Sequence, residues 1–388
     1  MNEAVTAITT EKDSAAAGAR LGDEMRGALN GGAPDAVVVF ASAQHGFEAL
    51  LEALAERSGC RTIVGSSSAG EFTTSTQGEG YVSALALRSD EMRFAIGLGT
   101  GVKRDPTAAA RQVAASFRGV DGAPEPYRAA LVMTDALAGH ADALVEELTV
   151  ATRGNYKFFG GGAGDDGLFE KTYVFDGTRA VTDAVVAMEI LSQRPLGIGV
   201  SHGWIPASEP FRVTEAAGSR IVGLNGMPAV DAIEEHAEET GQRFDRAAPL
   251  PFFLHNIIGI RSDGHYRLRV PLAVNADGSI ECAAGVPQGS VVHIMKTSEE
   301  SAVLAAHQAT TAALEALGGL RPKAALVFDC VATRLRLGRA FGNELKACAD
   351  LLRPAGFVGC NTYGQIARAE GQFGGFHNCT AVVCVMPE

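Results

Sequence analysis

The sequence predicts a layered α/β fold in which mixed sheets are covered by helices and an antiparallel β meander is inserted. Three segments repeat one order of strand, helix, strand, glycine-rich turn and strand, and such internal repeats indicate one architecture used several times. Apolar residues make up 46% of the 388 residues and charged residues only 20%, which excludes a disordered chain and a coiled coil. The length predicts two or three packed units.

The first repeat begins with a continuous apolar run at 37–42, followed by a helical pattern at 46–57. It reaches a second strand that runs into the turn at 63–71 and closes with a strand at 81–87. Continuous β-branched and apolar runs are typical of strands buried on both faces of a sheet. The helix carries apolar residues at three- and four-residue spacing, so we expect it to cover one face of that sheet.

The second and third repeats follow the same order. In the second, the elements are expected at 129–135, 141–152, 158–166, 171–177 and 183–190; in the third, they are expected at 324–330, 339–353, 357–366 and 379–387.

The region between them, from about 194 to 321, has a different pattern. Residues 265–295 alternate apolar and polar side chains around two turn signals, which predicts an antiparallel meander. We place a domain boundary near 220, giving an N-terminal extension at 1–29, a first domain at 30–220 and a second at 221–388.

Charge and composition narrow the partners and the compartment. Lys and Arg number 33 against 45 Asp and Glu, a net charge of −12, which argues against a nucleic-acid partner. We find no apolar run approaching the roughly 18 residues that would span a bilayer, and no apolar signal segment at the start. We therefore expect a cytoplasmic protein that does not associate with a membrane. The seven cysteines are an odd number, mostly within apolar runs, and we expect free buried thiols.

Two motif matches fail on context. Residues 162–167 spell G-x-G-x-x-G, but a strand-like stretch follows where a dinucleotide-binding turn would open a helix. Residues 199–203 spell G-x-S-x-G with His202 beside the serine, but the following Trp-Ile-Pro is a poor start for the helix that a nucleophile elbow needs. We do not expect nucleotide binding or serine hydrolase chemistry.

Three of the nine histidines lie in apolar or aromatic surroundings: His202, His255 and His293. An imidazole in such a setting is a candidate axial ligand for the iron of a haem b, with at most one or two of the three serving. The same surroundings are equally typical of core strands, so a structural role remains the alternative.

Carboxylates follow the glycine-rich turns in corresponding places of two repeats, namely Glu71 in the first and Asp165 and Asp166 in the second. Ligands tend to bind where such turns cluster at one end of a sheet. The alternative is turn chemistry, because an Asp side chain accepts hydrogen bonds from its own backbone.

Ten short motifs together resemble the FIST sensory domain over residues 30–386. Those of its N-terminal half are SSSAGE at 66–71, GGGAGDD at 160–166, SHGW at 201–204, VT at 213–214 and LNGMPA at 224–229. Those of its C-terminal half are DGSI at 277–280, VPQGS at 286–290, CVATR at 330–334, GCNTYGQI at 359–366 and HNCT at 377–380.

The resemblance implies a bacterial signal-input module that binds small ligands such as amino acids. It leaves no room in the chain for an output domain, so we expect the signal to pass to a separate protein. The leading hypothesis is a haem-dependent nitric-oxide sensor, like the freestanding subgroup of this family, acting on a histidine kinase or a cyclic-di-GMP enzyme. A homodimer of this chain is compatible with that hypothesis.

The main alternative is a sensor of amino acids or other small metabolites without haem. Its ligand amine would meet Glu71, Asp165 or Asp166, and its carboxylate would meet Arg334. Tyr363 and Gln365 belong to the candidate ligand set through the family motif, although the family often has Glu where this chain has Gln365, which leaves the recognition of an amine open there.

An enzyme of unknown chemistry is the third alternative. Its candidate nucleophiles are Cys330 and Cys360, provided that the pKa of either thiol is lowered. The sequence shows no complete set of nucleophile, base and orienting group.

Overall fold

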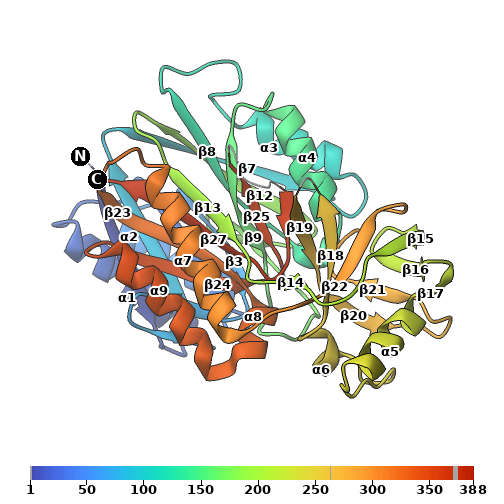
Figure 1. Cartoon of the computed structure of the whole chain (residues 1–388). Coiled ribbons are helices and arrows are strands. Elements are labelled where there is room, and N and C mark those ends of the chain that lie inside the picture. The colour runs from blue at the N-terminus through green and yellow to red at the C-terminus, as the bar shows by residue number, and fades with distance from the viewer. Residues whose placement is uncertain (1, 263, 370–374) are drawn as a thin grey trace.

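The computed structural model describes residues 2–262, 264–369 and 375–388. Within them the chain forms three six-stranded mixed sheets and a separate nine-stranded antiparallel sheet (Figure 1). The three mixed sheets share one plan and make three structural units, and the antiparallel sheet belongs to an insertion in the third unit. This is the predicted fold class.

The first unit has a strand, a helix, a strand, a helix, a strand, a short hairpin and a closing strand. They are β1 (Asn2–Thr9), α1 (Ser14–Ala28), β2 (Ala36–Ser42), α2 (Phe47–Ser58), β3 (Ile63–Ser68), β4 (Glu71–Thr73), β5 (Gln77–Gly78) and β6 (Val82–Ser89).

The second unit repeats that order. Its elements are β7 (Met92–Thr100), α3 (Pro106–Ala115), β8 (Tyr127–Thr134), α4 (Ala141–Ala151), β9 (Lys157–Gly162), β10 (Val174–Asp176), β11 (Arg179–Val181) and β12 (Ala184–Ser192).

The third unit repeats it again with one extra short helix, α8. Its elements are β13 (Gly197–Ser201), α7 (Glu299–Glu315), β23 (Pro322–Cys330), α8 (Val331–Leu337), α9 (Phe341–Leu352), β24 (Gly356–Thr362), β25 (Gln365–Arg368), β26 (Gly375–His377) and β27 (Ala381–Pro387).

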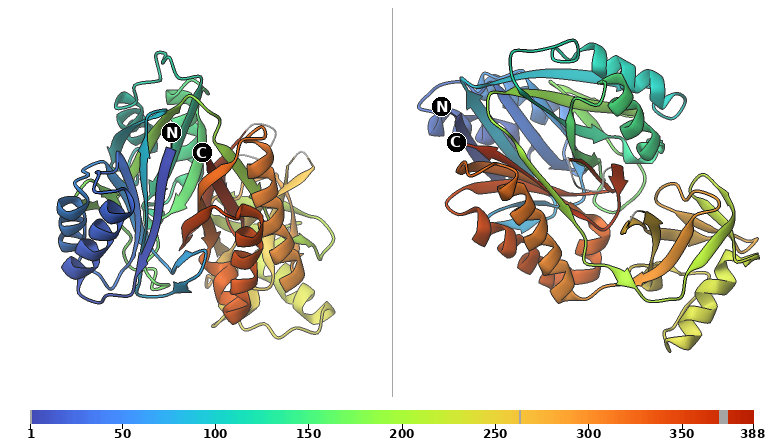
Figure 2. Two further views of the ribbon diagram at one scale, coloured as in Figure 1. Left: turned by 90° about the vertical axis from the view of Figure 1, so that its left-hand side faces the viewer. Right: turned by 45° about the horizontal axis from the view of Figure 1, so that its top comes forward.

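The insertion lies between β13 and α7 and projects to one side of the molecule (Figure 2). Its elements are β14 (Ile205–Pro206), β15 (Phe211–Ala217), β16 (Arg220–Leu224), β17 (Met227–Pro228), α5 (Ala229–Glu239), α6 (Leu250–Phe253), β18 (Ile257–Ser262), β19 (His265–Arg269), β20 (Pro271–Val274), β21 (Ile280–Cys282) and β22 (Val291–Lys296).

The units exchange their hairpins in a ring. The hairpin β4–β5 of the first unit pairs with β24 of the third, β10–β11 of the second pairs with β3 of the first, and β25–β26 of the third pairs with β9 of the second. Within each sheet the two central strands, β2 and β3, β8 and β9, or β23 and β24, run parallel. Each sheet is therefore complete only when a neighbour supplies its edge.

The core lies between the inner faces of the three sheets. There Phe328 packs edge-on against Phe40, with ring centroids 5.5 Å apart, and contacts Phe159 at 6.4 Å. Each outer face is covered by a helix pair, α1 with α2, α3 with α4, and α7 with α9, as the two views of Figure 2 show. Because both faces of the central strands are buried, those strands are the continuous apolar runs of the sequence.

Equivalent glycines let the parallel strands approach closely. A Cβ on Gly65 would lie 1.7 Å from the carbonyl oxygen of Val39, and one on Gly160 would lie 2.1 Å from that of Val132. Both glycines have positive φ, 157° and 138°, which side chains rarely adopt. In the third unit, a Cβ on Gly359 would lie 2.0 Å from the carbonyl oxygen of Val327.

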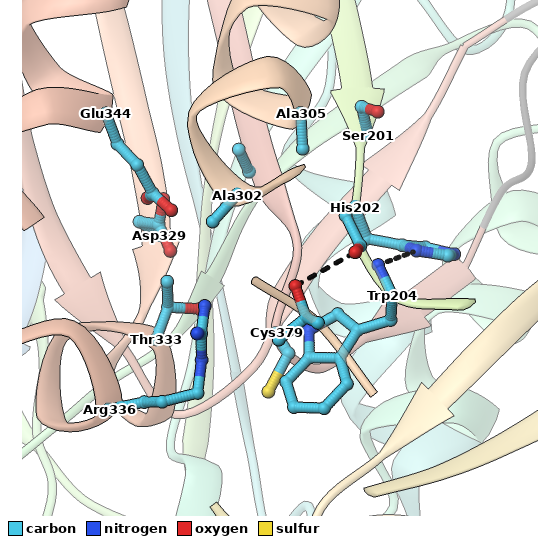
Figure 3. Close-up of a pocket in the computed structure, with 13 residues that line it drawn as sticks. Ser201, His202, Trp204, Ala302, Ala305, Asp329, Thr333, Arg336, Glu344 and Cys379 are labelled. Atoms are coloured by element: carbon cyan, nitrogen blue, oxygen red, sulfur yellow. Dashed lines mark hydrogen bonds between the residues drawn. The ribbon is translucent and has the colours of Figure 1, made fainter. Parts of the chain in front are cut away.

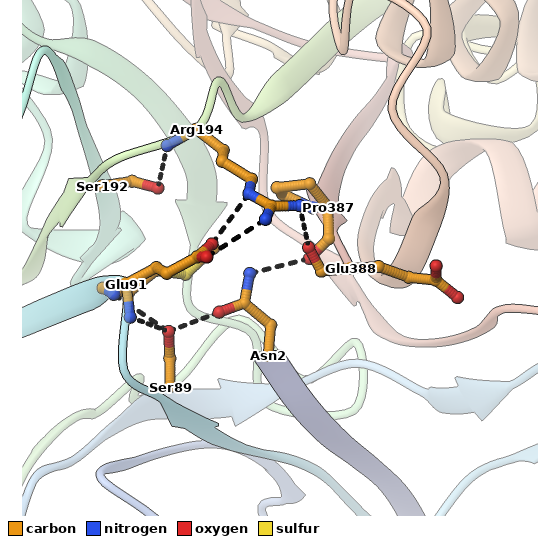
Figure 4. A network of polar contacts seen from close by, with 8 residues as sticks. Asn2, Ser89, Glu91, Ser192, Arg194, Pro387 and Glu388 are labelled. Atoms are coloured by element: carbon orange, nitrogen blue, oxygen red, sulfur yellow. Dashed lines mark hydrogen bonds and ion pairs between the residues drawn. The ribbon is translucent and has the colours of Figure 1, made fainter.

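The N-terminal residues differ from the expectation. Residues 2–28, expected as an extension, form β1 and α1, which occupy the places that β7 and α3 occupy in the second unit. The two chain ends lie side by side (Figure 1) and share a polar network (Figure 4). In it Asn2 donates to the carbonyl oxygen of Pro387 at 3.0 Å, and Arg194 bridges Glu91 and the carbonyl oxygen of Glu388. No helix in the described part of the chain is long and apolar enough to cross a membrane.

Candidate functional site

The three glycine-rich turns meet at the end of the molecule opposite the chain termini and bind one another in a ring. The backbone N–H of Ala69 in the first turn donates to the carbonyl oxygen of Asn361 in the third at 2.9 Å. The N–H of Gly164 in the second turn donates to the oxygen of Ser67 in the first at 3.0 Å. The N–H of Tyr363 in the third turn donates to the oxygen of Gly162 in the second at 2.9 Å. Candidate residues from different repeats are thus brought to one place, as expected for turns at one end of a sheet.

Glu71 lies at the start of β4, where this strand pairs with β24. Its side chain is buried, accepts a hydrogen bond from the Ser68 hydroxyl at 2.5 Å and another from the Tyr81 backbone N–H at 3.0 Å. Burial away from water raises the pKa of Glu71 to about 8, because desolvation outweighs these two bonds. The carboxyl is therefore mostly protonated at neutral pH.

Arg334 and Asn361 line the same cavity as Glu71 and both lie close to Gly70. A Cβ on Gly70 would come within 2.8 Å of the Asn361 Oδ1 and 3.2 Å of the Arg334 Nε. Asn361 is 1% exposed, and among the described residues neither its amide oxygen nor its amide nitrogen has a hydrogen-bond partner. Within the same part of the chain the buried Nε of Arg334 also lacks a partner, while its Nη1 forms an ion pair with Glu79.

These three side chains line one cavity of about 130 Å³, which Phe72, Gln77, Gly78, Gly338 and Phe341 complete. A buried polar group without a partner costs about 1–3 kcal/mol, and such groups are uncommon in folded proteins. Unsatisfied amide and guanidinium groups that converge on a cavity are what a polar small-molecule site requires. We call this cavity the Asn361 cavity.

The second-repeat carboxylates do not line it. Asp165 is buried, and its oxygens accept backbone N–H bonds from Phe169, Glu170 and Lys171 at 2.7–2.8 Å together with the Tyr363 hydroxyl. These contacts are the turn chemistry that the sequence left as the alternative to ligand binding.

Asp166 has a φ of 58° and accepts a hydrogen bond from the Ser42 hydroxyl at 2.6 Å. Burial raises its pKa, and its Oδ1 has no partner. It is not among the residues that line the Asn361 cavity, so of the three candidate acids only Glu71 lines that cavity together with Arg334.

Gln365 and Tyr363, the two candidates taken from the family motif, contact other residues of the protein. Gln365 is fully buried, donates to the Thr362 hydroxyl at 2.9 Å and accepts from the Thr380 backbone at 3.3 Å. Tyr363 stacks on Phe169, with ring centroids 4.3 Å apart. Its ring lines a second, mainly apolar cavity of about 90 Å³, bounded also by Leu272 and Cys330. The sequence did not indicate this cavity, whose walls come from the second unit, the insertion and the third unit.

His202, His255 and His293 lie around the junction of the insertion and the third unit. The Nε2 of His202 bonds the Tyr266 carbonyl oxygen at 3.0 Å, and its Nδ1 accepts from the Trp204 backbone at 3.3 Å. The Nδ1 of His293 bonds the Ser208 carbonyl oxygen at 3.0 Å. Burial lowers the pKa of His202 and of His255.

His202 lines a small cavity that is too small for a haem (Figure 3). It measures about 10 Å³, which is about the space that one water needs. Because both ring nitrogens of His202 are already bonded and the space is so small, the residues at this position do not fit a haem. Ser201 donates to Gln308 at 3.0 Å, so it forms no nucleophile pair with His202.

The same small cavity contains a carboxyl pair that the sequence did not indicate. Asp329 and Glu344 are buried against each other (Figure 3), and desolvation raises the pKa of both, that of Glu344 to about 7. One available signal was the position of Glu344 on the apolar stripe of α9, next to Leu345 and Cys348.

Two family models match the chain. The FIST N domain model matches residues 35–227, and the FIST C domain model matches residues 229–368. No curated protein matches.

Solved structures give distant likenesses. A cyanuric acid hydrolase from A. caulinodans is 9% identical, with 100% of this chain and 99% of that chain covered and a TM-score of 0.33. PurLQS from Thermotoga maritima is 11% identical, with 99% and 72% covered and a TM-score of 0.24. At these scores the likenesses carry no conclusion about function.

Proposed function

The chain belongs to the FIST family, and on that premise we propose that it is a sensor of a small polar metabolite that binds in the Asn361 cavity. FIST domains are generally signal-transduction domains that sense small ligands. The proposal adds where this chain holds its ligand and which chemical groups recognise it. Of the hypotheses drawn from the sequence, it takes up the haem-free metabolite sensor.

The observation that carries the proposal is the state of Asn361. Its amide is 1% exposed, has no partner and lines a cavity with Arg334 and Glu71. A ligand that accepts from the amide nitrogen and donates to the amide oxygen would recover the free energy that these groups lose on burial. Arg334 adds a cation suited to a carboxylate.

The cavity volume and charges define the ligand class. A volume of about 130 Å³ suits a molecule with few heavy atoms that carries a carboxylate and a neighbouring polar group, such as a small amino acid or hydroxy acid. Because Glu71 is mostly protonated near pH 7, a ligand ammonium group placed against it would lower its pKa and release a proton.

Ligand screening by thermal unfolding tests the proposal. The panel contains small amino acids, hydroxy acids and the corresponding amides that lack the carboxylate. A ligand at about 100 times its dissociation constant should stabilise the protein by about 2.7 kcal/mol, and the amides should not. If no member of the panel raises the melting temperature of the wild type, the proposal is wrong.

The haem and nitric-oxide hypothesis remains a prediction, as does a histidine kinase or cyclic-di-GMP enzyme as the partner. Titration with haemin distinguishes this hypothesis from the metabolite sensor, because haem bound through His202, His255 or His293 gives a Soret band that shifts when nitric oxide is added. Loss of that band in a single-histidine variant would identify the ligand.

A further inference from the structure

Two cysteines from distant parts of the third unit lie in one buried apolar cluster, and Cys379 also lines the small cavity of Figure 3. Cys330 is the last residue of β23, and Cys379 lies in the turn between β26 and β27. Both are buried, 3% and 5% exposed, in one apolar cluster with Trp204. Cys379 has a φ of 50°, a conformation that residues other than glycine rarely adopt and that is found more often at functional sites.

The surroundings of the two sulfurs are unequal. The Cys330 sulfur faces the thiol and backbone N–H of Cys379, the backbone N–H of Ala332 and the Gln365 amide, and these contacts lower its pKa to about 6 despite burial. The contact with Cys330 raises the pKa of Cys379. Cys330 is therefore the more acidic thiol of the two and lies beside a second thiol, the arrangement of a reactive cysteine with its resolving partner.

The other five thiols are in a different state. Burial raises the pKa of Cys60 to about 11 and those of Cys282 and Cys348 to about 12. The pKa values of Cys360 and Cys384 are raised by burial as well. Cys360, one of the two candidate nucleophiles from the sequence, therefore lacks the activation that Cys330 has.

Cys330 is reached from the apolar cavity of about 90 Å³ that Tyr363 also lines. A water molecule takes about 30 Å³ in the liquid, so this volume admits a small hydroperoxide and disfavours bulky reagents. The space beside Cys379 is about 10 Å³. The reagent would therefore arrive on the Cys330 side.

We propose that Cys330 and Cys379 form a redox modification site that a small hydroperoxide converts into an intramolecular disulfide. The Cys330 thiolate attacks one peroxide oxygen, so that the S–O bond forms and the O–O bond breaks. The leaving oxygen takes a proton and departs as water or an alcohol. Cys379 then attacks the sulfenic sulfur, the S–S bond forms, the S–O bond breaks, and the released hydroxide takes the Cys379 proton to give water.

The electrons balance, because the two sulfurs together lose the two electrons that the peroxide gains. The modified Cys330 lies close in sequence to Arg334, which lines the Asn361 cavity. Helix α8 begins at Val331, directly after Cys330, and carries Arg334 one turn later. Cys330 therefore lies one helical turn from a residue that lines the Asn361 cavity. The disulfide itself does not depend on any ligand.

Mass spectrometry of folded protein tests the site. The protein is treated with a small excess of hydrogen peroxide at pH 7, unfolded in an alkylating reagent and digested. We expect a Cys330–Cys379 peptide pair that dithiothreitol separates, with the other five cysteines alkylated. Full alkylation of Cys330 and Cys379 after peroxide treatment would overturn the proposal, as would a disulfide between other cysteines.

Two variants complete the test. Cys379→Ser keeps the size of the side chain but removes the resolving thiol, so peroxide treatment of the folded variant should leave Cys330 as the sulfenic acid. Dimedone, added as the variant is unfolded, should then label Cys330, and absence of that label would also overturn the proposal. Cys384→Ser is the matched control, because Cys384 lies five residues after Cys379 in the same strand region, and this variant should form the disulfide as the wild type does.

Discussion

The turns of the first and second units are built alike but use their acidic residues differently. In the second, Asp165 accepts three backbone N–H groups and the Tyr363 hydroxyl, and so holds the turn together. In the first, Glu71 accepts two bonds, is held mostly protonated and lies beside Asn361, whose amide has no partner. Burial of an acidic side chain therefore does not by itself identify a ligand site. Buried polar groups without hydrogen-bond partners that line the same cavity as the acid do.

The comparison has an energetic basis. A buried carboxylate with several N–H donors stabilises the fold, because hydrogen bonds to charged groups contribute about 1.5–3 kcal/mol each. An unpaired buried amide does the opposite, and a protein keeps one at a cost in stability that ligand binding can offset. Removal of the Asp165 carboxylate should therefore destabilise the fold, whereas removal of the Asn361 amide should change its stability little.

The largest effect is expected for Asp165→Ala. Loss of the carboxylate leaves three backbone N–H groups and a tyrosine hydroxyl without their acceptor, so the free energy of unfolding should fall by about 3 kcal/mol or more. Thermal unfolding followed by circular dichroism measures it. Asp121→Ala is the control, because Asp121 is 85% exposed in a surface ion pair and should matter by less than about 0.5 kcal/mol. Equal effects of the two variants would refute the structural role of Asp165.

The next effect is a pH dependence at Glu71. Its pKa rises from 4.5 to about 8 on folding, so between these values the folded state keeps a proton that the unfolded state has lost. Stability therefore falls as pH rises through this window. Glu71→Gln should match the wild type near pH 5 and exceed its stability at pH 8.

Asp329 and Glu344 act in the same direction in both proteins, so the difference between wild type and E71Q isolates Glu71. Glu48→Gln, at an exposed position of α2, is the control and should leave the pH profile unchanged. A constant difference between wild type and E71Q from pH 5 to pH 8 would show that Glu71 is ionised throughout.

A smaller loss is expected for Tyr363→Phe. The substitution removes the bond that the hydroxyl donates to Asp165 and the one that it accepts from the Gly167 backbone at 2.9 Å, but keeps the stacking on Phe169. Because Asp165 retains its three backbone donors, the loss should be about 1–2 kcal/mol. Urea unfolding monitored by the fluorescence of the single tryptophan measures it. A loss as large as that of D165A would mean that the tyrosine bond dominates the turn.

The smallest effect on stability is expected for Asn361→Ala. The amide has no bond to lose, so the change should stay within about 0.5 kcal/mol or be slightly stabilising. The same unfolding measurement checks it, with D165A alongside. A loss of several kcal/mol would show that Asn361 serves the fold in the way that Asp165 does.

The repeated units could be predicted because their central strands are buried on both faces and so appear as continuous apolar runs. The strand at 37–42 and the helix at 46–57 agree closely with β2 and α2. The role of residues 2–28 was missed because β1 is only half-buried and α1 is rich in Ala and Gly, which weakens both patterns. The exchange of hairpins could not be seen, because strands of two to four residues give no signal of a distant partner.

The candidate site was predictable in part. Glu71 and Arg334 were selected from the sequence, and the fold places both on one cavity. The lack of hydrogen-bond partners for the Asn361 amide among the described residues was not predictable. Whether an amide is paired depends on which groups other strands bring near it. Asp329 was hidden in an apolar strand, and its partner Glu344 on a helix, since each is a lone acid until the fold joins them.

Isothermal titration calorimetry of wild type and N361A, with a ligand found by thermal shift, tests the central claim most directly. Asn155→Ala, at an exposed asparagine of the second unit, is the matched control. We predict binding to wild type and N155A with equal affinity, and at least about tenfold weaker binding to N361A, because one well-made buried hydrogen bond contributes about 1.4 kcal/mol. Equal affinity of N361A and the wild type would contradict the account.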